Sequence, residues 1–196
     1  MAGHIKLTGD YLRQAEALLL QVVQILQANV NNYSLEGGTL LGIVREGRLL
    51  PWDSDVDLSV MYEDIHDLDV LLKSLKEAGL RVRIRKNTNI DERLPEGMPR
   101  IIKIRFKRFF GLLKSKVCLD VFIKYRVGEK VYWGVGDLMQ SVPAYYYDNY
   151  DTINFKGKKL SVPIEFKLYL DHKYGDWETP VKKWSTFIDD LSIEKE

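Results

Sequence analysis

The sequence is poor in the residues that build disulfides and zinc sites. It has one cysteine, Cys118, so no disulfide can form within the chain. Cys118 lies in the apolar stretch VCLDVFI, where a small buried side chain is a commoner role than a reactive thiol. The three histidines, His4, His66 and His172, show no ligand spacing, so we expect no zinc site. This cysteine usage fits a reducing, cytoplasmic compartment.

Long apolar runs and an excess of one charge are also missing. No stretch reaches the roughly 18 uninterrupted apolar residues that a membrane-spanning helix needs. The start, MAGHIKLTGDYLRQAEALLL, has charges before and within its short apolar run and no small-residue cleavage site. We therefore expect a soluble protein without a secretion signal. Because 29 Lys and Arg nearly balance 28 Asp and Glu, overall charge gives no reason to expect nucleic-acid binding.

What is present is enough apolar material for a core, since 45% of the 196 residues are hydrophobic. We predict one domain over residues 1–196, with an N-terminal helix at about 8–30, a catalytic core at about 31–125 and a C-terminal segment at about 126–184. Further helices are expected at 39–44, 64–78 and 163–174, and strands at 33–35, 56–61, 80–85, 101–106 and 117–125, with short strands and turns up to about residue 160. This order predicts an α+β, α/β-like fold with helices around one mixed sheet. The acidic and basic ending, 189–196, predicts a frayed tail.

Three aspartates, Asp53, Asp55 and Asp57, stand at every second position just before an apolar stretch. On a strand, Asp55 and Asp57 would project to the same face, with their carboxylates about 7 Å apart. If they leave bulk water, such like charges need a cation or water between them. Carboxylate oxygens suit Mg²⁺, which also takes phosphate oxygens. The alternative is that PWDSDVDLS is an exposed edge strand carrying solvated charges.

Two further features favour a bound ion and phosphate. Gly37 and Gly38 precede a helix predicted to open at Thr39, and glycine lets backbone N–H groups approach a diphosphate at the positive end of a helix. Asp120 lies inside VCLDVFI, where an isolated carboxylate is costly unless it faces something polar or ionic. Asp120 is therefore a candidate metal ligand or general base, although the outer face or the end of a strand would also accommodate it.

Several cationic and aromatic residues could complete such a site. Lys103 and Arg105 alternate with apolar residues, so they share a strand face and could draw an anionic donor toward the metal; a solvated face is the ordinary alternative. Arg45 could hold a phosphate through its planar fork or form a structural ion pair. The segment WGVGDLMQSVPAYYYDNY could stack a pyrimidine or a sugar, although three consecutive tyrosines cannot all point one way. YGDW, at 174–177, predicts a helix-ending turn rather than a rim of the site.

Together these motifs resemble the LicD family of phosphotransferases, which includes the fukutin-related proteins, within the nucleotidyltransferase superfamily. GGTLLGIVREGRLLPWDSDVDLSV is similar to the stretch in which that family has a glycine turn and helix, an arginine, a PWD and an acidic pair. VPIEFKLYLDHKYGDWETP is similar to the family's ending, and the resemblance runs from about residue 15 to 184. Glu46 stands where the family often has His, and Ser54 where it often has Asp.

The resemblance implies a nucleotidyltransferase fold and an enzyme that moves a phospho-alcohol group, of the phosphocholine or ribitol or glycerol phosphate type, from a CDP-linked donor to a sugar hydroxyl of a cell-surface glycan such as lipopolysaccharide or teichoic acid. It implies Mg²⁺ or Mn²⁺ held by Asp55, Asp57 and Asp120. The matching substrate-binding residues are Gly37, Gly38, Thr39, Arg45 and Trp52, to which the strand pattern above adds Lys103 and Arg105.

Two other functions would use the same acids. One is transfer of a nucleotide to a small molecule or a protein, and the other is nucleotide binding by a non-catalytic module. In either case no nucleic-acid partner is expected. The expected location is the cytoplasm, where a peripheral contact with the inner face of the membrane would bring the enzyme to a lipid-linked acceptor.

Overall fold

The structure is a computed structural model that describes residues 5–88, 91–108 and 113–194. Its main sheet has the strand order β1-β2-β6-β4-β3, with β5 beside β4, and β7 and β8 extending from β6. The strands of this sheet are β1 (Ser34–Leu35), β2 (Asp55–Met61), β3 (Leu80–Lys86), β4 (Pro99–Arg108), β5 (Leu113–Lys114), β6 (Cys118–Val127), β7 (Lys130–Val135) and β8 (Leu138–Pro143). A separate antiparallel hairpin consists of β9 (Tyr150–Phe155) and β10 (Lys158–Pro163). Because β2 runs parallel to β6 and β4 runs antiparallel to it, the predicted mixed sheet is confirmed.

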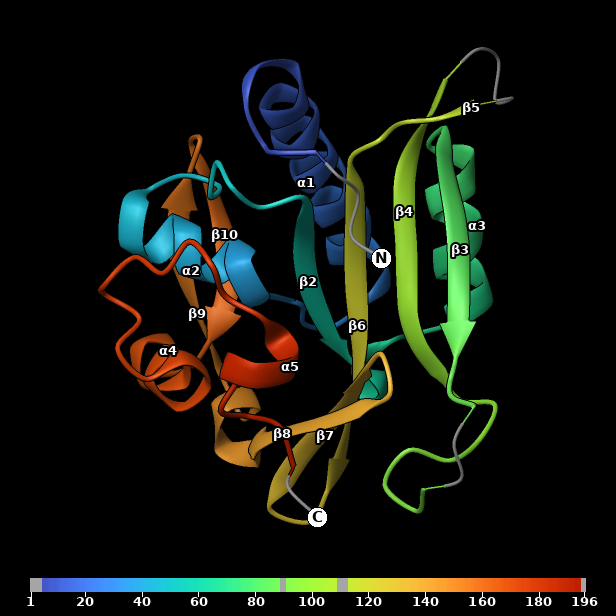
Figure 1. The fold of residues 1–196 in the computed structure, drawn as a ribbon. Helices are drawn as coiled ribbons and strands as arrows, with labels where there is room; N and C mark the ends of the chain where they lie inside the picture. The colour runs from blue at the N-terminus through green and yellow to red at the C-terminus, as the bar shows by residue number, and fades with distance from the viewer. Residues whose placement is uncertain (1–4, 89–90, 109–112, 195–196) are drawn as a thin grey trace.

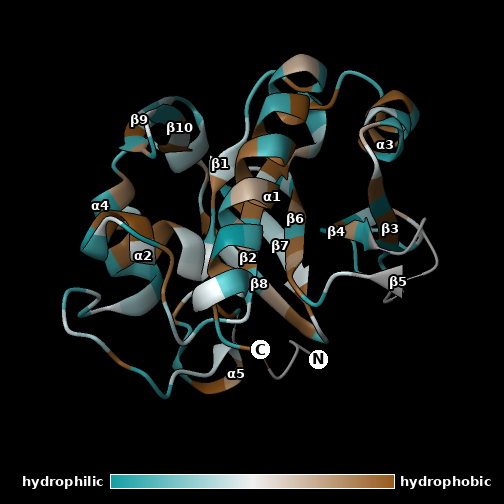
Figure 2. Cartoon of the chain, turned by 90° about the horizontal axis from the view of Figure 1, so that it is seen from above, coloured by the Kyte–Doolittle hydropathy of each residue, from teal (hydrophilic) through white to brown (hydrophobic). Residues whose placement is uncertain are grey.

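The helices cover the sheet unequally. They are α1 (Gly9–Asn29), α2 (Gly37–Glu46), α3 (Leu68–Glu77), α4 (Phe166–Tyr174) and α5 (Thr186–Asp189), with single 3₁₀ turns η1 (Tyr62–Asp64) and η2 (Ala144–Tyr147). Both α1 and α3 pack on one face of the main sheet, whereas α2, α4 and the β9–β10 hairpin lie beyond β2 (Figure 1 and Figure 2). In the described ranges, no helix combines the length and the apolarity needed to cross a membrane.

Successive side chains of the central strands point to opposite faces of the sheet, so the core lies on one face and the candidate site on the other. The side of α1 that is buried carries Ala15, Leu18, Leu19, Val22, Val23 and Leu26. Alternate residues of β2, β6 and β4 are buried in the same core, namely Val56, Leu58, Leu119, Val121, Ile102 and Ile104. Each fully buried side chain of this size contributes about 1.5–3 kcal/mol. The residues between them, including Asp57 and Asp120, project from the opposite face of the sheet.

The starts of two helices differ from the predicted ones because acidic side chains cap them. α2 begins at Gly37 rather than Thr39, since the Glu36 carboxylate accepts the Gly37 N–H at 3.2 Å. α3 begins later than predicted, at Leu68, because the Asp67 carboxylate accepts the N–H groups of Asp69 and Val70 at 2.8 and 3.0 Å. Gly79, at φ +80°, follows α3 in the left-handed conformation that its position predicted.

The prediction of a frayed tail at 189–196 is wrong for the described residues 189–194. Asp190 and Ser192 are buried, and Ile193 forms an isolated β-bridge with Gln140. The Asp190 carboxylate lies 3.1 Å from the Nζ of the buried Lys173. The segment therefore packs against the rest of the protein, where Asp190 pairs with Lys173, and its composition does not predict this ion pair.

Candidate active site

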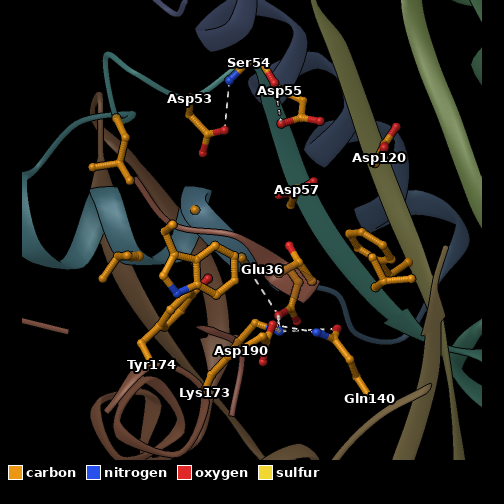
Figure 3. Close-up of a pocket in the computed structure, with 18 of the residues that line it drawn as sticks. Glu36, Asp53, Ser54, Asp55, Asp57, Asp120, Gln140, Lys173, Tyr174 and Asp190 are labelled. Atoms are coloured by element: carbon orange, nitrogen blue, oxygen red, sulfur yellow. Dashed lines mark hydrogen bonds and ion pairs between the residues drawn. The ribbon is translucent and has the colours of Figure 1, made fainter. Parts of the chain in front are cut away.

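The three predicted acids meet on the open face of the sheet. β2 already includes Asp55, so Asp55 and Asp57 project to the same side. Asp57 is paired directly with Asp120 across the parallel β2–β6 pair. One carboxylate oxygen from each of the three lies within 4.8 Å of the other two, and Figure 3 shows them around one side of a cavity. β1 pairs with β2 only at Leu58 and Ser59, but Glu36 and Thr39 bond to the backbone of Asp57 on that side, so Asp57 does not lie on an exposed strand edge.

This cluster suits a hard divalent cation. Mg²⁺ binds oxygens at about 2.0–2.1 Å, so opposite ligands lie about 4 Å apart and oxygens within 4.8 Å need only a small contraction. Burial and then the neighbouring carboxylates raise the pKa of Asp57 well above its usual range. Burial and then Asp55 raise the pKa of Asp53 to about 7. The residues therefore fit a cation, which would relieve the repulsion among them.

The glycine turn packs directly against these acids. A Cβ on Gly37 would lie 2.7 Å from Oδ2 of Asp57, and one on Gly38 would overlap Oδ2 of Asp53. Gly37 also has φ +55°, which disfavours a side chain. The sequence predicted that glycine here lets a phosphate approach the backbone; the structure adds that it lets the acids approach the positive end of α2.

Thr39 is placed differently from its expected position in a phosphate cradle. It is buried, and its Oγ1 accepts the backbone N–H of Asp57 at 2.9 Å. The backbone N–H of Glu36 donates to the carbonyl oxygen of Asp57 at 3.1 Å. Thr39 does not line the cavity, and it holds Asp57 in position from behind.

The cavity has a volume of about 720 Å³, within the range of small-molecule sites. Asp53 lines it together with the three acids of the cluster, and residues of the 173–190 segment form a second wall. Within YGDW, Gly175 ends α4 as predicted, but Tyr174, Asp176 and Trp177 also line the cavity, so the motif is both a turn and a rim. Of the three consecutive tyrosines, Tyr146 and Tyr147 are buried.

Arg45 and Trp52 lie on the wall next to α2. Arg45 donates to the Glu46 carboxylate and to the Trp177 carbonyl oxygen, each at 3.0 Å. Its guanidinium carbon lies 6.0 Å from the centroid of the Trp52 ring, and the Lys182 Nζ lies 5.9 Å from the same ring. The buried Nε of Arg45 has no hydrogen-bond partner. The Glu46 carboxylate and the Trp177 carbonyl oxygen thus fix the Arg45 side chain, and its Nε–H group forms no hydrogen bond.

Lys103 and Arg105 share the cavity face, as the alternation predicted. Lys103 is paired with Asp120 across β4 and β6, and its Nζ donates to the Asp120 carboxylate. Arg105 donates to the carbonyl oxygens of Ser115, at 3.1 Å, and Lys116. Lys103 therefore provides the cluster with a counter-charge from within the chain.

The single cysteine contacts this cluster of acids, whereas the two described histidines lie away from the cavity. Cys118 is buried and its Sγ lies 3.1 Å from Asp120 Oδ1; burial, followed by Asp120, raises the pKa of the thiol to about 12. Such a thiol stays protonated at neutral pH, as a small buried side chain would. Neither His66 nor His172 lines the cavity, and His4 lies outside the described residues.

The sequence reasoning missed a buried ionic cluster beneath the glycine turn. Lys124 is fully buried, with its Nζ 2.6 Å from Glu36 Oε2 and 3.7 Å from the centroid of the Trp133 ring. Tyr169 donates its hydroxyl to Glu36 Oε1 at 2.6 Å. Lys173 Nζ lies 3.8 Å from Glu36 Oε1 (Figure 3).

Burial and the neighbouring charges have opposite effects on the pKa of Glu36 and on that of Lys124. Burial alone would raise the pKa of Glu36, but Lys124 and Lys173 outweigh it and lower that pKa to about 2. Burial lowers the pKa of Lys124 to about 8 despite Glu36. The sequence contains one indication of this cluster. Lys124 follows Asp120 at an even spacing in an apolar strand, so both side chains are expected on the same face of the sheet, which is the face of the cavity.

Comparison with known proteins agrees with the motifs. A family model described as LicD/FKTN/FKRP, nucleotidyltransferase domain, matches residues 30–165. The chain belongs to this family. The resemblance predicted from the sequence is therefore confirmed.

Relatives of this LicD-family chain include two ribitol-phosphate transferases. It is 26% identical over 179 residues to the human ribitol-5-phosphate transferase FKTN, covering 89% of this chain and 35% of the relative. It is 43% identical over 60 residues to the human ribitol 5-phosphate transferase FKRP, covering 31% of this chain and 12% of the relative. An uncharacterized protein of Rickettsia prowazekii is 23% identical over 178 residues, covering 88% of this chain and 58% of the relative. The chain thus spans 58% or less of the length of each relative, and the family supports phospho-alcohol transfer as the general class of reaction.

Proposed function

We propose that this LicD-family chain is a metal-dependent transferase that moves a phospho-alcohol group from a CDP-linked donor to a sugar hydroxyl of a cell-surface glycan. The observation that carries the proposal is the convergence of Asp55, Asp57 and Asp120 within 4.8 Å, beside a glycine turn at the start of a helix. The cavity of about 720 Å³ is large enough for a nucleotide-linked donor. Relatives that are ribitol-phosphate transferases support the kind of group transferred.

The acids have separate tasks in this proposal. Asp55 and Asp57 hold Mg²⁺ or Mn²⁺ through their carboxylate oxygens. When bound, such an ion neutralises charge on the donor diphosphate and on the leaving oxygen. Asp120 either completes the set of ligands or accepts the proton of the attacking sugar hydroxyl. Thr39 and Glu36 act on this chemistry indirectly, because they fix the backbone of Asp57.

The donor is bound mainly on the α2 side of the acids. The positive end of α2, where Gly37 and Gly38 line the cavity, faces the donor diphosphate. Arg45 supplies positive charge at the cavity wall, and Trp52 supplies an aromatic surface for the donor. Lys103 and Arg105 add positive charge on the far side of the cluster and guide the anionic donor into the cavity.

A donor screen tests the proposal against its alternatives. Purified protein is incubated with Mg²⁺, a candidate glycan acceptor and CDP-choline, CDP-ribitol, CDP-glycerol, CTP or ATP, and the released CMP and pyrophosphate and the mass gained by the acceptor are quantified. Release of CMP from a CDP-alcohol supports phospho-alcohol transfer. Release of pyrophosphate from CTP or ATP would instead indicate transfer of a nucleotide, and binding without turnover would indicate a non-catalytic module.

A further inference from the structure

Residues 178–189, here called the cavity loop, begin and end beside α4 (the red segment in Figure 1). At the start of the loop, Trp177 is buried and its indole N–H donates to Asp171 of α4 at 2.8 Å. At the end, the buried Asp190 lies 3.1 Å from the Nζ of Lys173, which is also on α4. Surface loops whose two ends are held close together are frequently functional.

Between these two ends the cavity loop is only weakly attached to the rest of the protein. None of its residues is buried. In the described part of the chain, each hydrogen bond of the loop has both partners within residues 176–189. Its Trp184 ring packs against Tyr174, with centroids 5.0 Å apart. A segment with so few buried apolar contacts and external hydrogen bonds opens and closes at low free-energy cost.

The same loop forms one wall of the cavity that contains the acids. Its lining residues are Thr179, Val181, Lys182, Trp184, Thr186 and Phe187. Phe187 and the adjacent Ile188 are nevertheless 66% and 82% exposed. Large apolar side chains are stabilised when they are removed from water. The loop therefore has apolar surface at the cavity that closure onto a ligand would cover.

Lys182 places an unpaired cation of the cavity loop on the wall next to α2. Its Nζ lies 5.9 Å from the centroid of the Trp52 ring, and the Arg45 guanidinium carbon lies 6.0 Å from the same ring. Arg45 is paired with Glu46, whereas Lys182 forms no ion pair with any described acidic side chain. Two cations beside one aromatic ring favour an anionic ligand between them. The neighbouring Lys183 does not line the cavity.

We propose that the cavity loop is a lid that closes over the bound donor and places Lys182 on the donor phosphates. The inference rests on the proposed function, because it takes a nucleoside diphosphate as the ligand of the cavity. Closure of the lid excludes water, which would otherwise compete with the acceptor hydroxyl for the donor.

The charge of the loop favours a lid over a membrane-binding segment. Its apolar residues could also enter a lipid surface, but Lys182 and Lys183 are balanced within the loop by Glu178 and Asp189. A loop without net positive charge gains little from an anionic bilayer. Insertion into a membrane is therefore kept as an alternative outcome of the test.

Spin labels on the full chain test for the movement. Nitroxides are attached at Ile188→Cys and at Gln24→Cys, an exposed position of α1, whereas the thiol of the buried Cys118 stays protonated and unlabelled. The distribution of distances between the labels is measured by pulsed electron paramagnetic resonance with Mg²⁺, before and after addition of CDP. We expect CDP to shift and narrow this distribution. A control pair with Lys158→Cys on β10 in place of the loop label should show no change.

Two adjacent lysines then test the contact with the phosphates. Lys182→Gln is compared with Lys183→Gln, which removes the same charge one residue away, and CDP binding in the presence of Mg²⁺ is measured by calorimetry. We expect CDP to bind about tenfold more weakly to Lys182→Gln and with unchanged affinity to Lys183→Gln.

The lid is overturned if CDP binds without changing the distance distribution, or if the two lysine variants bind CDP equally well. It is also overturned if vesicles of phosphatidylcholine and phosphatidylglycerol produce the same change without CDP, since the loop would then be a membrane contact. Absence of CDP binding to the unchanged protein would contradict the proposed function, and the lid with it. Failure of the lid alone is therefore distinguishable from failure of the proposed function.

Discussion

Asp57 on β2 and Asp120 on β6 are direct neighbours across two parallel strands, although they are far apart in the sequence. The start of α2 fixes Asp57 from behind, because the Thr39 hydroxyl accepts its N–H and the Glu36 N–H donates to its carbonyl oxygen. The candidate metal site thus depends on two features at once, the register of β2 against β6 and the position of the glycine turn.

Replacement of Asp57 with Asn removes one of the three clustered carboxylates. We expect metal-dependent donor turnover to fall by about a hundredfold or more, because the remaining acids hold the cation poorly. Without metal, the melting temperature should stay the same or rise, since burial and then repulsion by the neighbouring carboxylates raise the pKa of Asp57 in the unchanged protein. Turnover and melting temperature are measured with and without Mg²⁺. The exposed Asp137→Asn variant is the control, and full turnover by Asp57→Asn would exclude this site.

Gly37→Ala tests how closely the turn must approach the acids. Gly37 and Gly128 have similar positive φ angles, +55° and +58°, so alanine costs the backbone about 1 kcal/mol at either position. Only at Gly37 would the new Cβ meet a carboxylate, 2.7 Å from Asp57 Oδ2. We expect Gly37→Ala to lower donor turnover more than about tenfold and Gly128→Ala to retain it. Equal turnover in the two variants would show that the contact is unimportant.

The buried Lys124 should be essential for stability while Glu36 is charged. Lys124→Met leaves the Glu36 carboxylate without its nearest cation, so we expect the free energy of unfolding to fall by about 3–5 kcal/mol. The double variant Lys124→Met/Glu36→Gln should recover part of this loss, since no charge is then left without its partner. Urea unfolding of the three proteins measures both effects. A double variant no more stable than Lys124→Met would contradict this explanation.

Acid should weaken the same cluster. In the folded protein, Lys124 and Lys173 keep the pKa of Glu36 at about 2, against an ordinary value of 4.5. As the pH falls from 4.5 toward 2, the unfolded carboxyl takes up a proton before the folded one, so stability is lost in this window. Between about pH 5 and pH 3, we expect the unchanged protein to lose about 2 kcal/mol more than the double variant. Parallel pH profiles of urea unfolding in the two proteins would disprove the assignment.

Short-range patterns in the sequence correctly predicted which sides of α1, β2 and β6 are buried and where α3 ends. The period of apolar residues along α1 and the alternation along β2 and β6 specify which sides are buried, and the same alternation places Asp55 and Asp57 on one face. Glycine at Gly79 predicted the end of α3 because only a few residues adopt its φ readily. The family resemblance then connected Asp120 with the acidic pair, which alternation alone left open.

Features that depend on distant partners were not predicted. Asp190 is part of a polar ending, and only its buried partner Lys173 explains why this segment returns to the molecule. Thr39 looked like a phosphate ligand, yet the position of β2 directs its hydroxyl to the backbone of Asp57. Glu36, which precedes α2, and Lys124 on β6 are 88 residues apart and meet only in the folded chain, a relationship that no spacing along the chain encodes.

The central claim is a metal-dependent transfer at the cluster formed by Asp55, Asp57 and Asp120. ³¹P NMR of the protein with a CDP-alcohol, Mg²⁺ and a glycan acceptor measures it most directly, because the donor diphosphate, CMP and the new phosphodiester have separate resonances. The account predicts that CMP and the phosphodiester appear together, that both stop on addition of EDTA, and that neither appears with Asp57→Asn. Undiminished product formation after removal of the metal, or with Asp57→Asn, would contradict it.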